Sequence, residues 1–330
     1  MRAFARIVLA VGILGLVILP AAGQAAEFTF RVGVMNVAGH PGDLGAKLFA
    51  KNIEKASNGR IKVEVFPGGV LGTENEMWEA MKVGTVDLAT IAPGNMERFV
   101  PEMSIMSLPF LFKDFDHLFR VVRGPIGDKL VDAAFKKGDN LIIGWFGGSV
   151  RNLITRGKVV EKLEDLNGFK MRVWASPVVI ETWKVLGTVP VQVAYAEAYT
   201  ALQTGLVDGA ENEWSTFTLA KWVEPSKSVV LTEHIFSLRP LVMGGKQFRS
   251  LPKDMQDLVR KVGRDTAVEA NKMEMDYEDN ARKEVETKYK LKLVSVNRIP
   301  LIERTAGVRE TFAKKVGMEQ VVSEIGKLAR

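Results

Sequence analysis

The chain alternates between strand-like and helix-like segments, and this alternation limits it to a small number of folds. Residues 28–34 and 61–65 place apolar side chains at every second position, which is typical of strands with one buried face. Between them, residues 44–53 place apolar side chains on one face of a helix. A second helix begins at the Thr73–Glu76 capping box, and a strand at 86–91 follows it. This order predicts a wound α/β domain with a largely parallel sheet.

The second half of the chain repeats the plan. A short strand at 170–173 precedes a helix that begins at Ser176, a residue type that caps helix N-termini well. A strand at 189–193, a helix at 195–204 and a strand from Val207 follow. We therefore predict two wound α/β domains.

The chain changes character at Leu251. Residues 251–288 are rich in Lys, Glu, Asp, Met and Ala and predict a long helical region. One more strand follows in the stretch KLKLVSV, and the C-terminal end is helical again. The predicted fold is thus α/β with a long C-terminal helical region.

The first 26 residues have the features of a secretory signal peptide. Arg2 and Arg6 precede an apolar run at 7–19, and small residues lead to Ala26. A retained membrane anchor is the alternative, but the run is shorter than the roughly 20 residues that a spanning helix needs. We expect residues 1–26 to be removed and the protein to be periplasmic. The chain has no cysteine to carry a lipid at the cleavage point, so we expect it to be unlipidated.

Composition and spacing argue against several classes of site. The lack of cysteine excludes disulfides, thiol chemistry and cysteine-ligated metals. His40, His117 and His234 lie far apart, and neither a phosphate-binding loop nor a nucleophile elbow is present. The net charge of +6 is spread along the chain, which indicates solubility rather than nucleic-acid binding. We expect no metal, no cofactor, no nucleic-acid partner and no enzymatic activity.

Four stretches carry a resemblance to a known family: LGTENEMWEAMKVGTVDLATI, SLPFLFKD, LEDLNGFKMRV and PVQVAYAEAYTALQTGLVDGAENE. They resemble the substrate-binding subunit of tripartite ATP-independent periplasmic (TRAP) transporters, of the C4-dicarboxylate-binding (DctP) type. The resemblance covers the whole mature chain. It implies a periplasmic-binding-protein-like receptor with two domains and a hinge, which closes on a small organic acid in an interdomain cleft. It also implies delivery of the acid to the small and large membrane subunits of a sodium-coupled transporter.

The same resemblance, with the strand and helix pattern, predicts the domain limits. Domain I is expected to comprise residues 27–148 and 238–277, and domain II residues 149–237 and 278–330. Two other functions stay open. One is a periplasmic ligand sensor or interaction protein on the same fold, and the other is an enzyme that uses the same scaffold.

The resemblance implies ligand contacts in the second domain. The arginine of the family's K-x-R-V stretch, which clamps the ligand carboxylate, is Arg172 here. The asparagine that ends V-D-G-x-E-N is Asn212, and the aromatic residue of P-x-x-x-A-[FY]-x-E is Tyr195. A further arginine matches Arg151, although Arg156 is an alternative. The physical position of Arg172 supports its role, because ligands bind beyond the carboxyl ends of strands in wound domains and a guanidinium matches a carboxylate in two parallel hydrogen bonds.

First-domain contacts are expected from loops that follow the early strands. These loops are residues 36–40, the neighbourhood of Glu74, and residues 92–96, which include Asn95. Some sialic-acid-binding relatives carry a glutamate where this chain has IAPGN, which argues against a sialic acid as ligand.

Five candidates have a structural alternative. Asn212 follows a strand, where asparagine commonly forms a turn. Tyr195 fits the buried stripe of its own helix as well as a ligand contact, and Trp214 could line the cleft or fill a domain seam. His40 precedes a proline and suits a loop or a helix cap. Glu74 favours the positive end of the helix that it begins.

Overall fold

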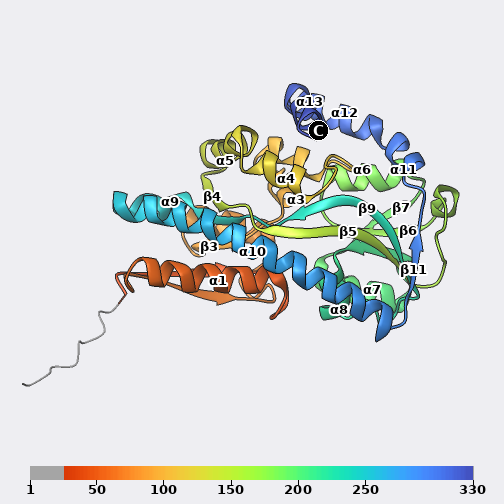
Figure 1. Cartoon of the computed structure of the whole chain (residues 1–330), viewed down its shortest axis with the longest axis horizontal. Helices are drawn as coiled ribbons and strands as arrows, with labels where there is room; N and C mark the ends of the chain where they lie inside the picture. Colours follow the sequence, from red (N-terminus) through yellow and green to blue (C-terminus); the bar gives the residue numbers. More distant parts are fainter. Residues whose placement is uncertain (1–25, 330) are drawn as a thin grey trace, which may run out of the picture.

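The computed structural model describes residues 26–329 as two lobes, each built on a β-sheet with helices on both faces (Figure 1). The first sheet has the strand order β2-β1-β3-β10-β4. Its strands are β1 (Phe28–Gly33), β2 (Ile61–Phe66), β3 (Leu88–Thr90), β4 (Asn140–Gly144) and β10 (Leu241–Gly244). The predicted signal peptide lies outside the described residues, apart from Ala26.

The second sheet has the order β11-β9-β5-β8-β6-β7. Its strands are β5 (Gly147–Thr155), β6 (Lys170–Val173), β7 (Val189–Gln192), β8 (Gly209–Asn212), β9 (Ser228–Leu238) and β11 (Lys292–Ser295). The α/β class and the two-lobed architecture predicted from the sequence are confirmed.

Helices cover both faces of both sheets. On the first lobe they are α1 (Pro41–Ala56), α2 (Glu74–Val83), α3 (Pro93–Met96), the 3-10 helix η1 (Pro101–Ser107), α4 (Phe115–Val122), α5 (Pro125–Gly138) and α9 (Gly245–Ser250). On the second lobe they are α6 (Pro177–Val185), α7 (Ala198–Thr204), α8 (Trp214–Leu219) and α11 (Ile299–Arg304). Two further 3-10 turns are η2 (Leu163–Leu166) and η3 (Tyr195–Glu197), so the predicted helix at 195–204 begins as a 3-10 turn.

The helix boundaries follow the capping residues of the sequence. The Thr73 side chain accepts a hydrogen bond from Glu76 N, and Glu76 Oε2 accepts one from Thr73 N at 2.7 Å, so the predicted capping box is present. Gly84 ends this helix at a φ of 87°, a left-handed conformation that suits glycine. Ser176 caps α6 by accepting from Val179 N.

Both sheets are mixed, whereas the sequence predicts largely parallel ones. Parallel pairs such as β1–β2 and β6–β7 form where a helix returns the chain to the same edge. Strand β10 is antiparallel to both of its neighbours, and so is β5. The difference arises because the chain crosses from one sheet to the other at 145–146 and returns at 239–240, and each crossing delivers a strand in the opposite direction.

Helix α10 (Lys253–Thr287) joins the lobes along one side of the molecule (Figure 1). Its first half packs Met255, Val259 and Val262 into the core of the first lobe, and its last turns pack Ala281 and Val285 into the core of the second. The long helical region predicted from Leu251 is therefore present as one 35-residue helix that belongs to both lobes.

The last two helices, α12 (Ala306–Lys315) and α13 (Glu319–Lys327), pack on the first lobe. Val308, Val321 and Ile325 share a buried cluster with Met77 and Trp78 of α2. The predicted domain limits assign Val308, Val321 and Ile325 to domain II. Those limits remain a prediction. The packing means that the C-terminal segment, like α10, links the two lobes.

Two buried acids lie on α10 beside the seam between the lobes. Glu274 accepts a hydrogen bond from Ser149 Oγ at 2.8 Å, and Glu278 accepts from the backbone N–H groups of Trp214 and Ser215 at 2.8 and 3.0 Å. Burial raises the pKa of Glu274 to about 7 and that of Glu278 to about 8, although hydrogen bonds to each carboxylate act in the opposite direction.

Glycines allow α10 to approach strand β4 at backbone distance. A Cβ atom on Gly263 would lie 2.4 Å from the carbonyl oxygen of Ile143, and one on Gly144 would lie 2.5 Å from the carbonyl oxygen of Gly263. In an exposed helix, Gly→Ala stabilises by up to about 1 kcal/mol. At this contact the sign should reverse, because neither backbone can move away without separating helix from sheet.

We predict that Gly263→Ala lowers the free energy of unfolding by about 1–3 kcal/mol, the range of overpacking in a tight core. The matched control is Gly307→Ala in α12, where a Cβ atom would meet nothing within 4 Å. Urea unfolding of the two variants and wild type measures the difference. A Gly263→Ala protein as stable as the control would show that the contact is not tight.

The raised pKa of Glu278 predicts a loss of stability with rising pH. The native carboxyl keeps its proton up to about pH 8, whereas the unfolded one releases it near its ordinary pKa, so the unfolding free energy falls across that interval. His40 has the opposite sign, because burial lowers its pKa to about 3, but it acts only below its ordinary value of 6.5. The window free of His40 is therefore pH 6.5–8, where we expect Glu278 itself to contribute a decline of about 2 kcal/mol, at about 1.4 kcal/mol per proton and pH unit. Glu274 and Glu97, whose pKa values burial raises to about 7, add to the decline with the same sign in the lower part of this window.

Urea unfolding at several pH values across that window tests the assignment. Glu278→Gln should lose the contribution of Glu278, roughly half of the decline, whatever its effect on stability at a single pH. Glu269→Gln, at an exposed position of the same helix, should keep it. An unchanged slope in Glu278→Gln would mean that this carboxyl is ionised in the native protein throughout the window.

Candidate functional site

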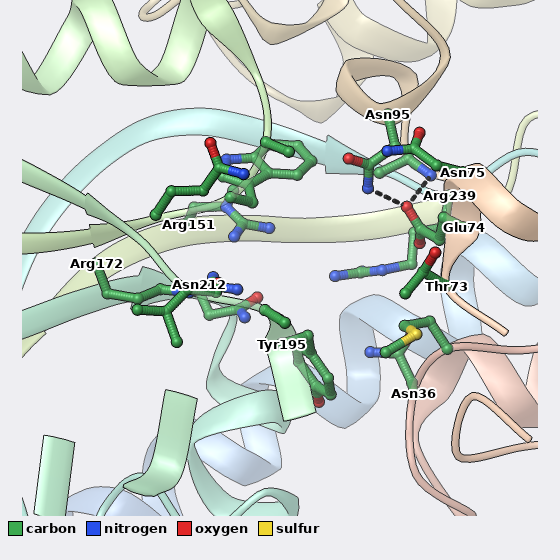
Figure 2. Close-up of a pocket in the computed structure, with 17 residues that line it drawn as sticks. Asn36, Thr73, Glu74, Asn75, Asn95, Arg151, Arg172, Tyr195, Asn212 and Arg239 are labelled. Atoms are coloured by element: carbon green, nitrogen blue, oxygen red, sulfur yellow. Dashed lines mark hydrogen bonds between the residues drawn. The ribbon is translucent and has the colours of Figure 1, made fainter. Parts of the chain in front are cut away.

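A cavity of about 250 Å³ lies between the lobes, where the carboxyl ends of strands from both sheets meet (Figure 2). The second lobe contributes residues from β5, β6, β7 and β8 and the segment after β7. The first lobe contributes the loop after β1, the start of α2 and the start of α3. The lining residues are Met35, Asn36, Thr73, Glu74, Asn75, Ala92, Asn95, Arg151, Arg172, Trp174, Ala175, Gln192, Val193, Ala194, Tyr195, Asn212 and Arg239.

Six of the eight site residues expected from the sequence line this cavity. They are Arg172, Asn212, Arg151, Tyr195, Glu74 and Asn95. Trp214 and His40 do not line it. Arg156, the alternative to Arg151, lies on the surface in a shallow depression with Tyr199 and Glu224, so the structure brings Arg151 and not Arg156 to the cavity.

Arg172 is a buried guanidinium without a carboxylate partner. It lies at the end of β6 and is 2% exposed, and its Nε donates to the carbonyl oxygen of Val193 at 3.0 Å. Among the described residues no carboxylate lies within salt-bridge distance of it, and its two terminal nitrogens donate no hydrogen bond. Burial is the main reason why the pKa of Arg172 falls to about 10, which still leaves it charged at neutral pH. A buried, charged and unpaired fork of N–H donors is an open site for an anion.

Arg151 lies beside Arg172 but is already paired. Its guanidinium forms ion pairs with Glu211 and with Glu213, the latter at 2.8 Å, and it stacks over Trp174 with 5.0 Å to the ring centre. Burial lowers the pKa of Arg151, but Glu211 and Glu213 outweigh burial and hold it above the ordinary value. Arg151 therefore stabilises the wall of the cavity through its ion pairs and also adds positive charge there.

Glu213 also holds a third arginine, Arg239. Arg239 Nη2 donates to both carboxylate oxygens at 2.9 and 3.0 Å, and Ser237 Oγ donates to one of them at 2.5 Å. Although burial opposes ionisation, the two arginines lower the pKa of Glu213 far below its ordinary value. Arg239 lies in the segment that crosses from β9 to β10, so this ion pair is part of the connection between the lobes.

Asn212 and Tyr195 complete the second-lobe wall. Asn212 is 1% exposed and its Oδ1 accepts from Glu213 N at 3.1 Å, which leaves its amide nitrogen without a hydrogen bond to any described residue. Tyr195 packs at 6.0 Å from Trp222, as its interpretation as a core residue predicts, and it also lines the cavity, so its contact with a ligand stays a prediction. Burial raises the pKa of Tyr195, which keeps its hydroxyl protonated and able to donate.

Glu74 and Asn95 form the opposite wall (Figure 2). Glu74 begins α2 as expected, but its carboxylate is buried and turned to the cavity rather than to solvent. Glu74 Oε2 accepts from Ala92 N at 3.2 Å and from the amide of Asn95. Burial raises the pKa of Glu74, while Asn95 and Arg239 act in the opposite direction.

Trp214 and His40 lie away from the cavity and have structural roles. Trp214 begins α8 and packs edge-on against Phe217 in the core of the second lobe. His40 caps α1 by accepting from Gly42 N at 3.1 Å, and its Nε2 lies 3.1 Å from Ser215 Oγ of the other lobe. The capping role of His40 is the structural alternative that the sequence predicted, and it is confirmed. The position of Trp214 in the core of the second lobe is decided by the tertiary structure.

Sequence reasoning did not single out Arg239 or Trp174. Arg239 stands before Pro240 at the end of a long strand, and that context gives no sign that the chain changes sheets there. Trp174 directly follows the strand that carries Arg172, so the rule that ligands bind beyond strand ends could have found it. Within residues 26–329 no cluster of His, Cys, Asp or Glu could hold a metal ion, and no helix there is long and apolar enough to cross a membrane.

Comparison with known proteins agrees with this geometry. The chain is 31% identical over 238 residues to the C4-dicarboxylate-binding periplasmic protein DctP of Vibrio cholerae, with 72% of this chain and 71% of that protein covered. A TRAP periplasmic solute-binding protein of Bradyrhizobium sp. BTAi1, solved in complex with α/β-D-galacturonate, matches with a TM-score of 0.86 at 33% identity, covering 90% of this chain and 99% of that one. One from Sulfitobacter sp. NAS-14.1 with bound α-D-taluronate matches with a TM-score of 0.86 at 30% identity, covering 91% and 97%.

Residues 33–315 match the bacterial extracellular solute-binding proteins of family 7, the DctP family. The match spans both sheets and almost all of the residues that surround the cavity. The chain therefore belongs to the DctP family of TRAP-transporter solute-binding proteins.

Proposed function

We propose that this chain binds a small organic acid in the cavity between its lobes, with Arg172 as the carboxylate anchor, and delivers it to a sodium-coupled TRAP membrane transporter. The observation that carries the proposal is the buried guanidinium of Arg172, whose terminal nitrogens have no acceptor among the described residues. A carboxylate accepts two parallel hydrogen bonds from such a fork and neutralises its charge. The acids bound in the related structures from Bradyrhizobium and Sulfitobacter each carry one carboxylate, which supports this chemistry.

The rest of the site supports binding without turnover. Asn212 and Tyr195 offer neutral donors next to Arg172, and the three arginines, Glu211 and Glu213 are fixed by ion pairs or by burial. The cavity is smaller than the roughly 300–1,000 Å³ of sites for drug-sized ligands, which suits a small metabolite. The ligand would contact both lobes and so favour the closed arrangement by its differential affinity.

We further infer that the mature protein is periplasmic and unlipidated, and that its partners are the small and large membrane subunits of the transporter. A reconstitution experiment separates transport from sensing. Proteoliposomes with both membrane subunits and a sodium gradient should take up the acid only when this protein is present. A sensor would bind the same acid but give no uptake.

Arg172 and Arg151 form a matched pair for testing the anchor. Arg172→Ala should weaken binding by about 3–5 kcal/mol, a hundredfold to a few thousandfold, because the bound carboxylate would lose its charged partner in a poorly hydrated site. Arg172→Lys should recover only part of that, since the charge returns without the fork. Asn212→Ala should cost about 1–2 kcal/mol.

The stability of the unliganded proteins should show the reverse order. Arg172→Ala removes a buried charge that has no ionic partner, so its melting temperature should stay the same or rise. Arg151→Ala leaves Glu211 and part of Glu213 uncompensated, and should cost about 3–5 kcal/mol.

Native mass spectrometry identifies the acid retained by the purified protein, calorimetry with that acid gives the affinities, and thermal unfolding gives the stabilities. An Arg172→Ala protein that binds the acid as tightly as wild type would end the assignment.

A further inference from the structure

The cavity has two chemically different ends (Figure 2). Arg172, Arg151 and Asn212 lie at the second-lobe end and present positive charge and N–H donors. Thr73, Glu74, Asn75 and Asn95 lie at the first-lobe end and present one carboxylate among neutral polar groups. Among the described residues that line the cavity, Glu74 is the single acid.

One oxygen of Glu74 is occupied and the other is not. Oε2 accepts from Ala92 N at 3.2 Å and from the Asn95 amide. Oε1 accepts no hydrogen bond from any residue between 26 and 329, although the side chain is buried at 7% exposure. Because Glu74 lines the cavity, this oxygen can accept a hydrogen bond from a hydroxyl of a ligand there.

The positive charges near Glu74 are already committed. Arg239 lines the cavity near Glu74 and pairs through Nη2 with both oxygens of Glu213, while Arg151 pairs with Glu211 and Glu213. These two arginines and two glutamates balance in charge, so among the three cavity arginines Arg172 alone has no described carboxylate within salt-bridge distance, and it lies at the opposite end. A second ligand carboxylate at the first-lobe end would therefore face Glu74 without a net positive charge to offset the repulsion. Like charges brought together in a buried site cost several kcal/mol.

The neutral neighbours of Glu74 also suit hydroxyl groups. Asn36 and Asn75 line the cavity, and each has a buried side-chain oxygen without a hydrogen-bond partner among the described residues. Thr73 adds a hydroxyl at the same end. These groups can exchange hydrogen bonds with alcohols but cannot neutralise an anion.

We propose that Glu74 is the specificity-determining residue of this cavity: its free oxygen accepts hydrogen bonds from ligand hydroxyls and excludes acids that carry a second carboxylate at that end. The ligand class is then a hydroxyl-rich monocarboxylate and not a dicarboxylate. The inference rests on the proposed function, because it takes Arg172 as the anchor of the first carboxylate.

Three acids that share their hydroxyl stereochemistry test the inference. D-Galactonate and D-galacturonate each carry one carboxylate, whereas galactarate carries a carboxylate at both ends of the same chain. D-Erythronate and meso-tartrate form a second, shorter pair that differs in the same way. Calorimetry at pH 7.5 measures the affinity of wild type, Glu74→Gln and Glu79→Gln. Glu79 is exposed on the same helix and pairs with Lys82, so its variant is the matched control.

Wild type should bind the monoacid of at least one pair at least a hundredfold more tightly than the diacid. Glu74→Gln should weaken monoacid binding by about tenfold and strengthen diacid binding by about tenfold, so that the ratio narrows by about a hundredfold. Glu79→Gln should leave both affinities unchanged. A structural role for Glu74 would instead lower both affinities by the same factor.

Three results would overturn the inference while leaving the proposed function intact. One is wild-type protein that binds a diacid as tightly as its monoacid, and another is a Glu74→Gln variant that keeps the wild-type ratio. Wild-type protein that binds none of these acids, and whose retained molecule in native mass spectrometry has two carboxylates or no hydroxyls, would also overturn it. Binding of no acid of any kind would contradict the proposed function itself.

Discussion

Three buried arginines and two buried glutamates lie beside the cavity, and only two of the arginines are paired with those glutamates. Glu213 holds Arg239 and, with Glu211, holds Arg151. Arg172 is left with a single hydrogen bond to a backbone carbonyl. Desolvation makes an unpaired buried charge costly, so the closed arrangement of the lobes is best stabilised when an anion fills the position opposite Arg172. The same pairing that fixes Arg151 and Arg239 leaves Arg172 as the arginine that we propose to bind the ligand carboxylate.

The pairing also explains why the lobes must meet at this place. Arg239 belongs to the segment that crosses from β9 to β10, and Arg151 belongs to the strand that follows the other crossing. His40 of the first lobe reaches Ser215 of the second behind the same cluster, and burial keeps this histidine neutral by lowering its pKa to about 3. Arg239 and His40 therefore have hydrogen-bond partners within the protein, whereas the terminal nitrogens of Arg172 and Glu74 Oε1 have none.

The far end of the cavity gives the complementary half of the recognition. The terminal nitrogens of Arg172 lack a hydrogen-bond acceptor, and Glu74 Oε1 lacks a donor. The two groups lie at opposite ends of the same cavity (Figure 2). A molecule with a carboxylate at one end and hydroxyls at the other satisfies both. Under the proposed function, the first lobe would therefore contact the hydroxyls of the ligand and the second lobe its carboxylate.

Much of this could be predicted from the sequence, because the signals involved are local. The capping box at Thr73, the N-cap at Ser176 and the long amphipathic helix each depend on residues a few positions apart, and all three are present. The motif around Arg172 and the one ending at Asn212 each place a polar residue at a strand end, which is where both lie.

The tertiary structure alone decided which charges are paired. Glu211 and Glu213 look like ordinary acids in the stretch GAENE, and nothing nearby in the sequence indicates that they neutralise Arg151 and Arg239 but leave Arg172 unpaired. The mixed sheets and the position of Trp214 in the core of the second lobe likewise depend on contacts between distant residues. Glu74 at the cavity and His40 as a helix cap were both expected from the sequence. Residue patterns over a few positions specify the helices and strands and where each of them ends. Contacts between residues dozens of positions apart determine the charge balance, and that balance makes the cavity a site.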